Sequence, residues 1–202
     1  MRDQRSQESV GDIDEFDFAR AREYSLLSAL LLRSPDVPML DRLASLRGDS
    51  SPLGLAHAAL GEAAARTDAA RAAREHHSLF TGLGRGELLP YASYYLTGFL
   101  HGRPLANLRH ALQRIGVERR DGQPEPEDHA AILLEIMAGL ASGTIPAPAG
   151  TDREIFDDHL GPWITRFFSD LEKAASAEFY ASVGTFGRTF VEIERQSFLL
   201  PR

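Results

Sequence analysis

Apolar residues recur at helical spacing along most of this 202-residue chain, and short groups of proline, glycine and serine separate the runs. The first run covers residues 13–33 and ends at Ser34-Pro35, because a proline disfavours helix in the residue before it. We find no alternating run of useful length and no internal repeat, so strands are not expected. The pattern predicts an all-α fold, with about eight to ten helices in a single helical-bundle domain.

Caps and breakers give the remaining boundaries. Residues 1 to about 12 are polar and aperiodic, which predicts a disordered N-terminal tail ahead of an all-helical domain over residues 13–202. Several glycines followed by Pro90 predict a definite turn over residues 82–91. The further predicted helices are 38–47, 51–65 capped by Ser51, 67–80 capped by Thr67, a stretch capped by Ser93, 104–115 begun by Pro104 and closed by Gly116, 126–142 with Pro126, Glu127 and Asp128 at its first turn, 151–160 capped by Thr151, 162–171 begun by Pro162, and 179–198.

The composition is that of an ordinary soluble protein, with 43% hydrophobic and 25% charged residues. A formal net charge of −7 disfavours nucleic acid as a partner, because binding to phosphates requires a basic face. The absence of cysteine excludes disulfides, thiol nucleophiles and thiolate-bound metal centres, and it suits a reducing cytosol. The first residues lack the apolar core of a secretory signal, and no segment is apolar enough to span a bilayer. We therefore expect a cytoplasmic protein without stable membrane insertion.

Two stretches place rigid backbone beside aromatic and polar side chains. The first joins Leu79-Phe80-Thr81-Gly82 to Leu89-Pro90-Tyr91-Ala92-Ser93, and the second is Pro124-Glu125-Pro126-Glu127-Asp128-His129 at a predicted helix start. Neither stretch is a catalytic motif. Proline and glycine backbone with a few polar groups beside apolar surface is typical of a groove that binds a peptide. The residues therefore favour binding over catalysis.

Three blocks of the sequence resemble the TorD/DmsD family of cytoplasmic chaperones, and the likeness covers about residues 20–198. The blocks are residues 75–95 (EHHSLFTGLGRGELLPYASYY), residues 125–129 with Leu134 and Met137 downstream, and residues 159–163 with Phe167, Phe168, Phe179 and Tyr180 after them. The resemblance implies an all-helical, non-enzymatic chaperone that binds the twin-arginine signal peptide on the precursor of a molybdenum-containing oxidoreductase. It also implies that the chaperone holds the precursor for cofactor insertion and export proofreading.

The glycine-rich version of the first block, LFTGLGRGELLPYASYYLTGFL, looks most like members associated with formate dehydrogenase, which is therefore the expected client. The resemblance implies no stably bound cofactor and at most a transient contact with the molybdopterin cofactor of the client. The sequence leaves a monomer and a domain-swapped homodimer open.

Asp128 and His129 are the sharpest candidates for a peptide site. Asp128 has two interpretations: it satisfies N–H groups at a helix start, or it or Glu127 accepts charge-assisted hydrogen bonds from signal-peptide arginines, worth about 1.5–3 kcal/mol each. His129 has a neighbouring group or a peptide carbonyl as its expected partner, and an ordinary pKa of about 6.5 would make binding pH-sensitive.

Groove-lining roles fit Pro90 and Tyr91, because a loop proline fixes the backbone and a tyrosine combines an apolar body with a polar tip. Leu79 and Phe80 also fit a core, Tyr24 fits either a groove wall or plain packing, and Gly102 fits either a turn or a close approach of peptide backbone. The full set of candidate peptide-binding residues is Tyr24, His76, Leu79, Phe80, Pro90, Tyr91, Ser93, Gly102, Pro126, Glu127, Asp128 and His129.

Other functions have weaker support. His76 and His77 are adjacent, and adjacent helical side chains point about 100° apart, so the pair cannot easily bind one metal ion. Arg119-Arg120 lies mid-chain and is interpreted as a solvated linker pair. The alternatives are a helical-bundle enzyme that uses His129 and nearby carboxylates, and a helical ligand-binding regulator, which the acidic charge disfavours. We assign no catalytic residue and no metal ligand.

Overall fold

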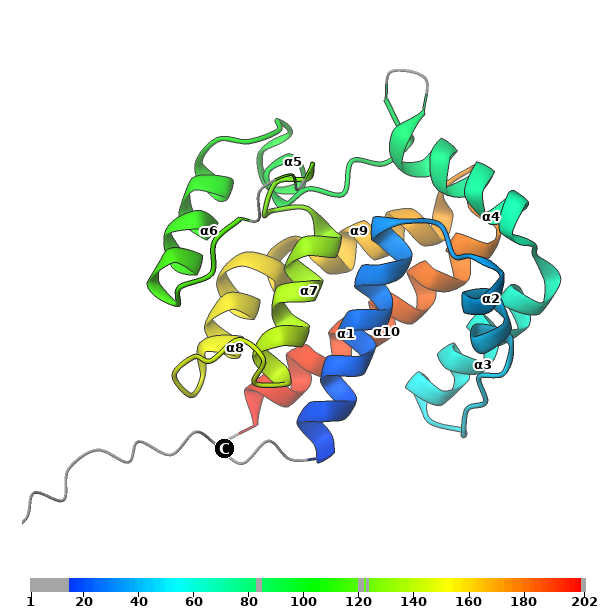
Figure 1. Cartoon of the computed structure of the whole chain (residues 1–202), viewed down its shortest axis with the longest axis horizontal. Helices are drawn as coiled ribbons and strands as arrows, with labels where there is room; N and C mark the ends of the chain where they lie inside the picture. The colour runs from blue at the N-terminus through cyan, green and yellow to red at the C-terminus, as the bar shows by residue number, and fades with distance from the viewer. Residues whose placement is uncertain (1–14, 83–84, 120–121, 123, 201–202) are drawn as a thin grey trace, which may run out of the picture.

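The computed structural model describes residues 15–82, 85–119, 122 and 124–200, and within them it confirms an all-α fold (Figure 1). The predicted tail over residues 1–12 and the predicted helix start at residue 13 lie outside the described residues. The elements are α1 (Glu15–Leu32), α2 (Val37–Ala44), α3 (Pro52–Arg66), α4 (Ala69–His76), the π-helical turn η1 (His77–Thr81), α5 (Ala92–Thr97), α6 (Arg103–Arg114), α7 (Ala130–Ala141), α8 (Thr151–Ile155), the π-helical turn η2 (Phe156–Leu160), α9 (Gly161–Lys173) and α10 (Phe179–Leu199).

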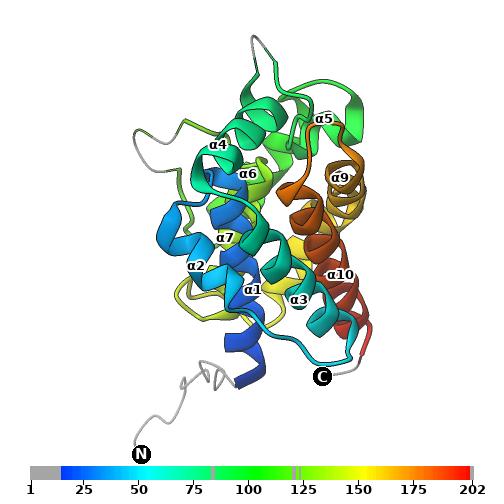
Figure 2. The same cartoon turned by 90° about the vertical axis from the view of Figure 1, so that its right-hand side faces the viewer.

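The helices α1, α7, α9 and α10 form the centre of the bundle (Figure 1). Helix α1 lies beside α7, α10 packs against α9 and α3, and α2 covers α3. Almost every face of α7 is buried, which explains why its sequence AAILLEIMAGLA is apolar nearly all round. Helices α5 and α6 lie at one end of the bundle, and the chain crosses that end on its way from α4 to α5 (Figures 1 and 2).

Large aromatic side chains fill the core between α9 and α10. Trp163, Phe167 and Phe168 are buried and recur at helical spacing along α9. Two glycines let α10 approach α9 closely, since a Cβ at Gly187 would lie 2.3 Å from Phe168 Cε1 and one at Gly184 would lie 2.6 Å from the Glu172 backbone nitrogen. A larger residue at either position would push the two helices apart.

A buried charge network joins α1 to α10. Arg20 and Glu194 have side chains that are 4% and 1% exposed. The Arg20 Nε donates to Glu194 Oε1 at 2.9 Å, and the Nη2 of the same guanidinium donates to Glu194 Oε2 at 2.9 Å. The Tyr24 hydroxyl also donates to Glu194 Oε2, at 2.8 Å, and Tyr24 is fully buried. Tyr24 therefore packs in the interior, and in this conformation its ring offers no surface to a peptide.

Several predicted helix starts are correct and others are displaced by one to a few residues. Ser51 caps α3 as predicted, its hydroxyl accepting from the Gly54 N–H at 3.0 Å. The prediction of Thr67 as the next cap is wrong, because the carboxylate of Asp68 accepts from the Arg71 N–H at 2.9 Å instead. The prediction for Thr151 is also wrong: it is the first helical residue of α8 and its hydroxyl donates to a backbone carbonyl.

Two further starts differ around the conspicuous motifs. The prediction that Ser93 caps a helix is wrong, since α5 begins at Ala92 and Ser93 lies inside it. The prediction that Pro126 lies in the first turn of a helix is wrong as well, because α7 begins only at Ala130 and residues 126–129 form a turn ahead of it. Pro126, Glu127 and Asp128 are residue types that favour the first turn of a helix, yet here they lie in a turn ahead of α7. The side chain of Asp128 is therefore free to cap a different helix.

The predicted helix over residues 67–80 continues past α4 as η1. Five residues, His77 to Thr81, take the wider π-helical turn, and it ends where Gly82 adopts a φ of 57° and donates its N–H to the His77 carbonyl at 2.7 Å. The predicted helix over residues 151–160 is likewise α8 followed by η2. π-helical turns are rare and are often found at functional sites.

Among the described residues, no helix combines the length and the apolar character that crossing a membrane requires.

Candidate functional site

The loop before α5 and the turn before α7 are joined by one antiparallel bridge, centred on Tyr91. The Ala92 N–H donates to the Asp128 carbonyl at 2.9 Å, and the Ala130 N–H donates to the Pro90 carbonyl at 2.8 Å. Two motifs that are far apart in the sequence therefore share one short stretch of paired backbone. The starts of α5 and α7 are fixed relative to each other as a result.

Asp128 caps a helix, but the helix is α5 and not the one that follows it in sequence. Its Oδ2 accepts a hydrogen bond from the Ser93 N–H at 3.0 Å, and both residues are fully buried. The other carboxylate oxygen, Oδ1, is buried without a hydrogen-bond partner. The Ser93 hydroxyl in turn accepts from the His101 N–H at 2.9 Å and so holds the connection between α5 and α6.

His129 is the cap of α7. Its Nδ1 accepts from the Ala131 N–H at 3.1 Å, which requires an unprotonated Nδ1. Burial lowers the pKa of His129 to about 4, despite the opposing effect of the carboxylates of Glu125 and Asp128. The ordinary pKa expected from the sequence does not hold, so His129 is neutral at pH 7. Its ring packs edge-on against Tyr91, with centroids 5.1 Å apart.

Tyr91 is half-buried, and its side chain connects the loop before α5 to the segment that contains Glu125. Its hydroxyl donates to Glu125 Oε2 at 2.6 Å. Burial, together with this hydrogen bond and the negative charge of Glu125, raises the pKa of Tyr91 above its usual range. The tyrosine therefore keeps its proton and offers a ring face and a neutral hydroxyl at the site.

An ion pair connects this turn to α6. Arg109 Nε donates to both carboxylate oxygens of Glu127 at 3.0 Å, and an Nη2 lies 2.9 Å from Glu127 Oε2. The Arg109 side chain is 44% exposed and that of Glu127 only 10%. Burial would raise the pKa of Glu127, but the hydrogen bonds and charge of Arg109 outweigh it and lower that pKa. Glu127 is thus a fixed, charged carboxylate.

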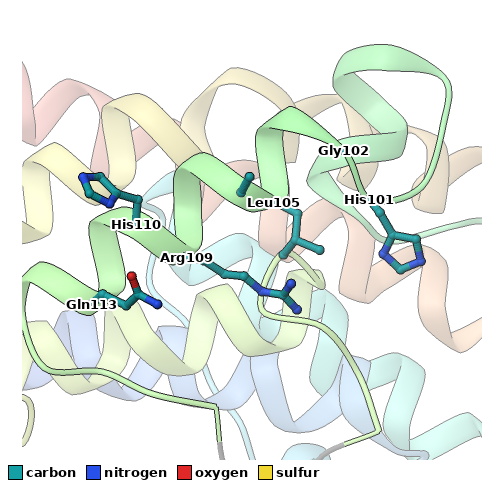
Figure 3. Close-up of a pocket in the computed structure, with 7 residues that line it drawn as sticks. His101, Gly102, Leu105, Arg109, His110 and Gln113 are labelled. Carbon is teal, nitrogen blue, oxygen red and sulfur yellow. The ribbon is translucent and has the colours of Figure 1, made fainter.

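A small cavity of about 450 Å³ opens beside this ion pair on the face of α6 (Figure 3). Figure 3 shows the side chain of Arg109 extending out of α6 toward the part of the cavity where Leu105 and His101 lie. Gly102, with a φ of 77°, forms the edge of the cavity just ahead of α6. A ligand side chain would have room here beside the Arg109 guanidinium.

The structure divides the candidate residues into four groups. Seven meet at the bridge and its surroundings, Gly102 lies at the nearby cavity, and His76 and Phe80 belong to a cluster around Tyr180. In that cluster the rings of His76 and Phe80 lie 5.0 Å apart. Tyr24 and Leu79 are fully buried in the core. The seven residues at the bridge are Pro90, Tyr91, Ser93, Pro126, Glu127, Asp128 and His129.

His76 is partly buried, and burial lowers its pKa, with a smaller opposing contribution from its contact with the Leu31 carbonyl at 3.2 Å. It is close enough to His129 that a positive charge on His76 lowers the pKa of His129. His76 therefore stands at the border between its own aromatic cluster and the bridge.

A larger cavity of about 1010 Å³ lies between α1, α2, α3 and α7. Its lining includes Leu26, Met39 and Leu43, together with His57 and Glu23, whose Nε2 and Oε2 atoms lie 3.0 Å apart. None of the candidate residues lines it. The larger of these two cavities is therefore not the one that contains a candidate residue.

Sequence reasoning missed the partners of the motif residues. Arg109 lies on the polar face of α6, and no local pattern links it to Glu127. Glu125 was part of the motif but received no role, although a tyrosine hydroxyl is its hydrogen-bond donor. Glu75 was missed too, and its carboxylate accepts from the backbone of residues 178–180 at the start of α10. No group of three or more metal-ligating side chains exists in the part of the chain that the structure describes.

Comparisons with known proteins agree on one family. A family model described as nitrate reductase delta subunit matches residues 47–169. The chaperone protein TorD of Vibrio cholerae is 28% identical over 126 residues, which is 58% of this chain and 57% of that protein. The chaperone protein TorD of Vibrio vulnificus is 31% identical over 144 residues, 64% of this chain and 67% of that protein. The chain thus spans little more than half the length of the first of these relatives.

A crystal structure shares the fold. It is that of a proposed redox enzyme maturation protein from Archaeoglobus fulgidus, with a TM-score of 0.61 and 20% identity, and the match covers 92% of this chain and 99% of that one. The family match includes both the loop before α5 and the turn before α7. This chain therefore belongs to the TorD/DmsD family, the one whose model is described as nitrate reductase delta subunit.

Proposed function

We propose that the chain is a chaperone and not an enzyme, and that it binds the twin-arginine signal peptide on the precursor of a molybdenum-containing oxidoreductase. By holding that peptide it keeps the precursor from export until the cofactor is in place. Its relatives in Vibrio are named as chaperone proteins, which supports the general role. The structural support comes from the bridge between the two motifs.

The observation that carries the proposal is the grouping of acidic and aromatic side chains at this bridge. Glu125, Glu127 and Asp128 follow one another within a single turn, and Tyr91 packs beside them. Carboxylates bind guanidinium groups through strong, charge-assisted hydrogen bonds. A peptide with two arginines ahead of an apolar stretch has the complementary chemistry, because its arginines match the carboxylates and its apolar part matches an aromatic surface.

The geometry opposes the enzymatic alternative. His129 would be the base, but burial lowers its pKa to about 4 and its Nδ1 is already engaged with the Ala131 N–H. The Asp128 carboxylate holds the α5 backbone at Ser93. A general base needs a lone pair within reach of a substrate proton. The Nδ1 lone pair of His129 is taken by the helix cap, and the unpartnered Oδ1 of Asp128 is fully buried, out of reach of a substrate in this conformation.

Calorimetric titration of the full chain with synthetic peptides tests the proposal. The first peptide carries two adjacent arginines and then an apolar stretch of about ten residues, the length typical of an export signal. In the control peptide both arginines are glutamines. We expect the arginine peptide to bind more tightly and its affinity to fall with added salt. Equal affinities for the two peptides, or no binding of either, would contradict the proposal.

Formate dehydrogenase is the client we propose, on the likeness of the sequence over residues 79–100. Affinity purification of the chain from cells that make several molybdenum enzymes, followed by mass spectrometry, tests this choice. Recovery of a different molybdenum enzyme precursor would reject formate dehydrogenase and retain the chaperone role. Any contact with the molybdopterin cofactor is proposed to be transient and to occur while the precursor is held.

A further inference from the structure

Arg109 places a guanidinium of the protein itself on the carboxylate that a peptide arginine would need. Its Nε reaches both oxygens of Glu127 at 3.0 Å, and its Nη2 lies 2.9 Å from one of them. This is the fork-like arrangement in which arginine recognises a carboxylate. An incoming arginine has to compete with Arg109 for the same two oxygens.

The two partners differ in how firmly they are held. Glu127 belongs to a turn that is fixed by the backbone pairing between Asp128 and Ala92, and its side chain is nearly buried. Arg109 projects from the polar face of α6, and 44% of its side chain is exposed to solvent. Arg109 can therefore swing into solvent without disturbing α6, while Glu127 stays in place. In this pair Glu127 is held in place, and Arg109 is the partner that can leave.

Space and a second acceptor lie next to the pair. The cavity of about 450 Å³ on α6 is lined by Arg109 itself and by His101, Gly102 and Leu105 (Figure 3). Asp128, the neighbour of Glu127, has its Oδ1 buried without a hydrogen-bond partner, and its charge acts on Arg109. Desolvation of such an oxygen is costly unless a donor reaches it. Next to the Arg109–Glu127 pair there is thus one carboxylate oxygen, Asp128 Oδ1, that accepts no hydrogen bond.

Two exposed apolar side chains come just before the cavity-lining residues in the sequence. Phe99 is 78% exposed and Leu100 is 44% exposed, and both immediately precede His101 and Gly102 on the connection from α5 to α6. Together they offer apolar area that an apolar segment of a ligand could bury. A peptide whose arginine enters the cavity would meet these side chains with the apolar residues that follow the arginine.

We propose that Arg109 is an internal competitor for the client's arginine: it occupies Glu127 in the free chaperone and leaves it when a signal peptide binds. The exchange replaces one guanidinium by another, so the Glu127 carboxylate is paired in both states and no buried charge is left alone. The apparent affinity for an arginine-containing peptide is the intrinsic affinity multiplied by the fraction of time that Glu127 is free of Arg109. This inference rests on the proposed function, since it assumes that the site binds arginine.

The test compares Arg109→Gln with Arg114→Gln, using the arginine and glutamine peptides described above. Arg114 lies on the same helix, is similarly exposed and pairs with Glu154 at a distance from the bridge, so it is a matched control for the loss of one positive charge. We expect Arg109→Gln to bind the arginine peptide about fivefold more tightly than the unchanged chain, which corresponds to about 1 kcal/mol. The gain is set at this modest level because solvent screens a pair with a half-exposed partner.

The control arms give the expected result its specificity. Arg114→Gln should leave the affinity for the arginine peptide unchanged, and Arg109→Gln should not gain affinity for the glutamine peptide. Arg109→Lys keeps the charge but loses the fork, so a smaller gain is expected from it. This second variant, together with a thermal unfolding scan of each protein, keeps the inference testable if Arg109→Gln proves unstable.

The outcomes separate the inference from the proposed function. If the unchanged chain binds the arginine peptide and neither Arg109 variant binds it more tightly, Arg109 is a structural tie between α6 and the turn, and the inference is wrong while the chaperone function stands. If both variants gain equally for the arginine and glutamine peptides, the effect does not pass through Glu127 and the inference is again wrong. If no protein binds either peptide, both proposals fail.

Discussion

Substitution of Asp128 tests whether one carboxylate serves both the fold and the peptide site. Asp128→Ala removes the acceptor of the Ser93 N–H, and that N–H lies in a fully buried residue where water cannot replace the lost partner. An orphaned buried donor costs about 1–3 kcal/mol, and loss of a helix cap about 0.5–2 kcal/mol, which are two views of the same bond. Removal of the unpartnered Oδ1 offsets part of this cost.

We therefore expect Asp128→Ala to lower the free energy of unfolding by about 1–2 kcal/mol. For a chain of 202 residues this corresponds to a fall in Tm of about 2–8 °C. Urea unfolding followed by circular dichroism measures the first quantity and a thermal scan the second. A variant as stable as the unchanged chain would refute the assignment of Asp128 as the cap of α5.

Asp128→Asn separates the cap from the charge. The amide oxygen can still accept from the Ser93 N–H, so most of the stability should remain, while the negative charge is lost. If that charge attracts peptide arginines, both variants should bind the arginine peptide about tenfold less tightly, which is about 1.4 kcal/mol. Full affinity of a folded Asp128→Asn would restrict Asp128 to its structural role.

Three further predictions follow from the same contacts. Tyr91→Phe removes the hydroxyl that donates to Glu125 and should lower the free energy of unfolding by about 0.5–1.5 kcal/mol in urea, whereas an unchanged value would mean that water replaces the bond. Glu194→Ala leaves the buried Arg20 without its main partner and should cost about 3–5 kcal/mol; a loss below about 1 kcal/mol would contradict this account of the network. The pKa of His129 is about 4 in the folded chain against an ordinary value of 6.5, so as the pH falls the unfolded state takes up this proton first. The contribution of His129 to the free energy of unfolding is therefore complete above pH 6.5 and should be lost as the pH drops toward 4. The variant His129→Asn, which keeps a capping oxygen, should show a flatter pH dependence over that window, and identical profiles would refute the contribution of His129.

The class of fold could be predicted because helical periodicity is a local property. The predicted helix over residues 162–171 lies within α9, and Trp163, Phe167 and Phe168, which recur at helical spacing in it, are buried. Ser51 with Pro52 marked a helix start correctly, since a cap and a first-turn proline act within one turn. Such signals do not depend on the rest of the chain.

The predictions failed where a distant residue decides the local structure. Pro126, Glu127 and Asp128 have the chemistry of a helix start, yet the backbone pairing of Asp128 with Ala92 holds them in a turn, and α7 begins at Ala130. The side chain of Asp128 then caps a helix that precedes it by 35 residues. No window of sequence around Asp128 contains that information.

The same limit applies to the candidate site. The motifs singled out Glu127 as a candidate, but the ion pair that neutralises it comes from Arg109 on another helix. The pKa of His129 departs from its ordinary value because of burial, which the sequence does not display. Residue types at the site could be predicted from the pattern; their partners and their charge states required the fold.

Folding and the proposed binding draw on the same few groups. Asp128 and Ser93 are fully buried in the free chain, while Tyr91 and Glu125 are partly exposed and are the groups that a peptide can contact first. A substitution such as Asp128→Ala, which removes a buried hydrogen bond, should therefore change stability and affinity together, whereas substitutions at the partly exposed residues should change affinity with a smaller effect on stability. A peptide that binds only the folded chain also stabilises it, by about 2.7 kcal/mol at a free concentration one hundred times its Kd. Binding of the precursor's signal peptide would then raise the free energy of unfolding of the chaperone, because the paired backbone that forms the site also fixes α5 against α7.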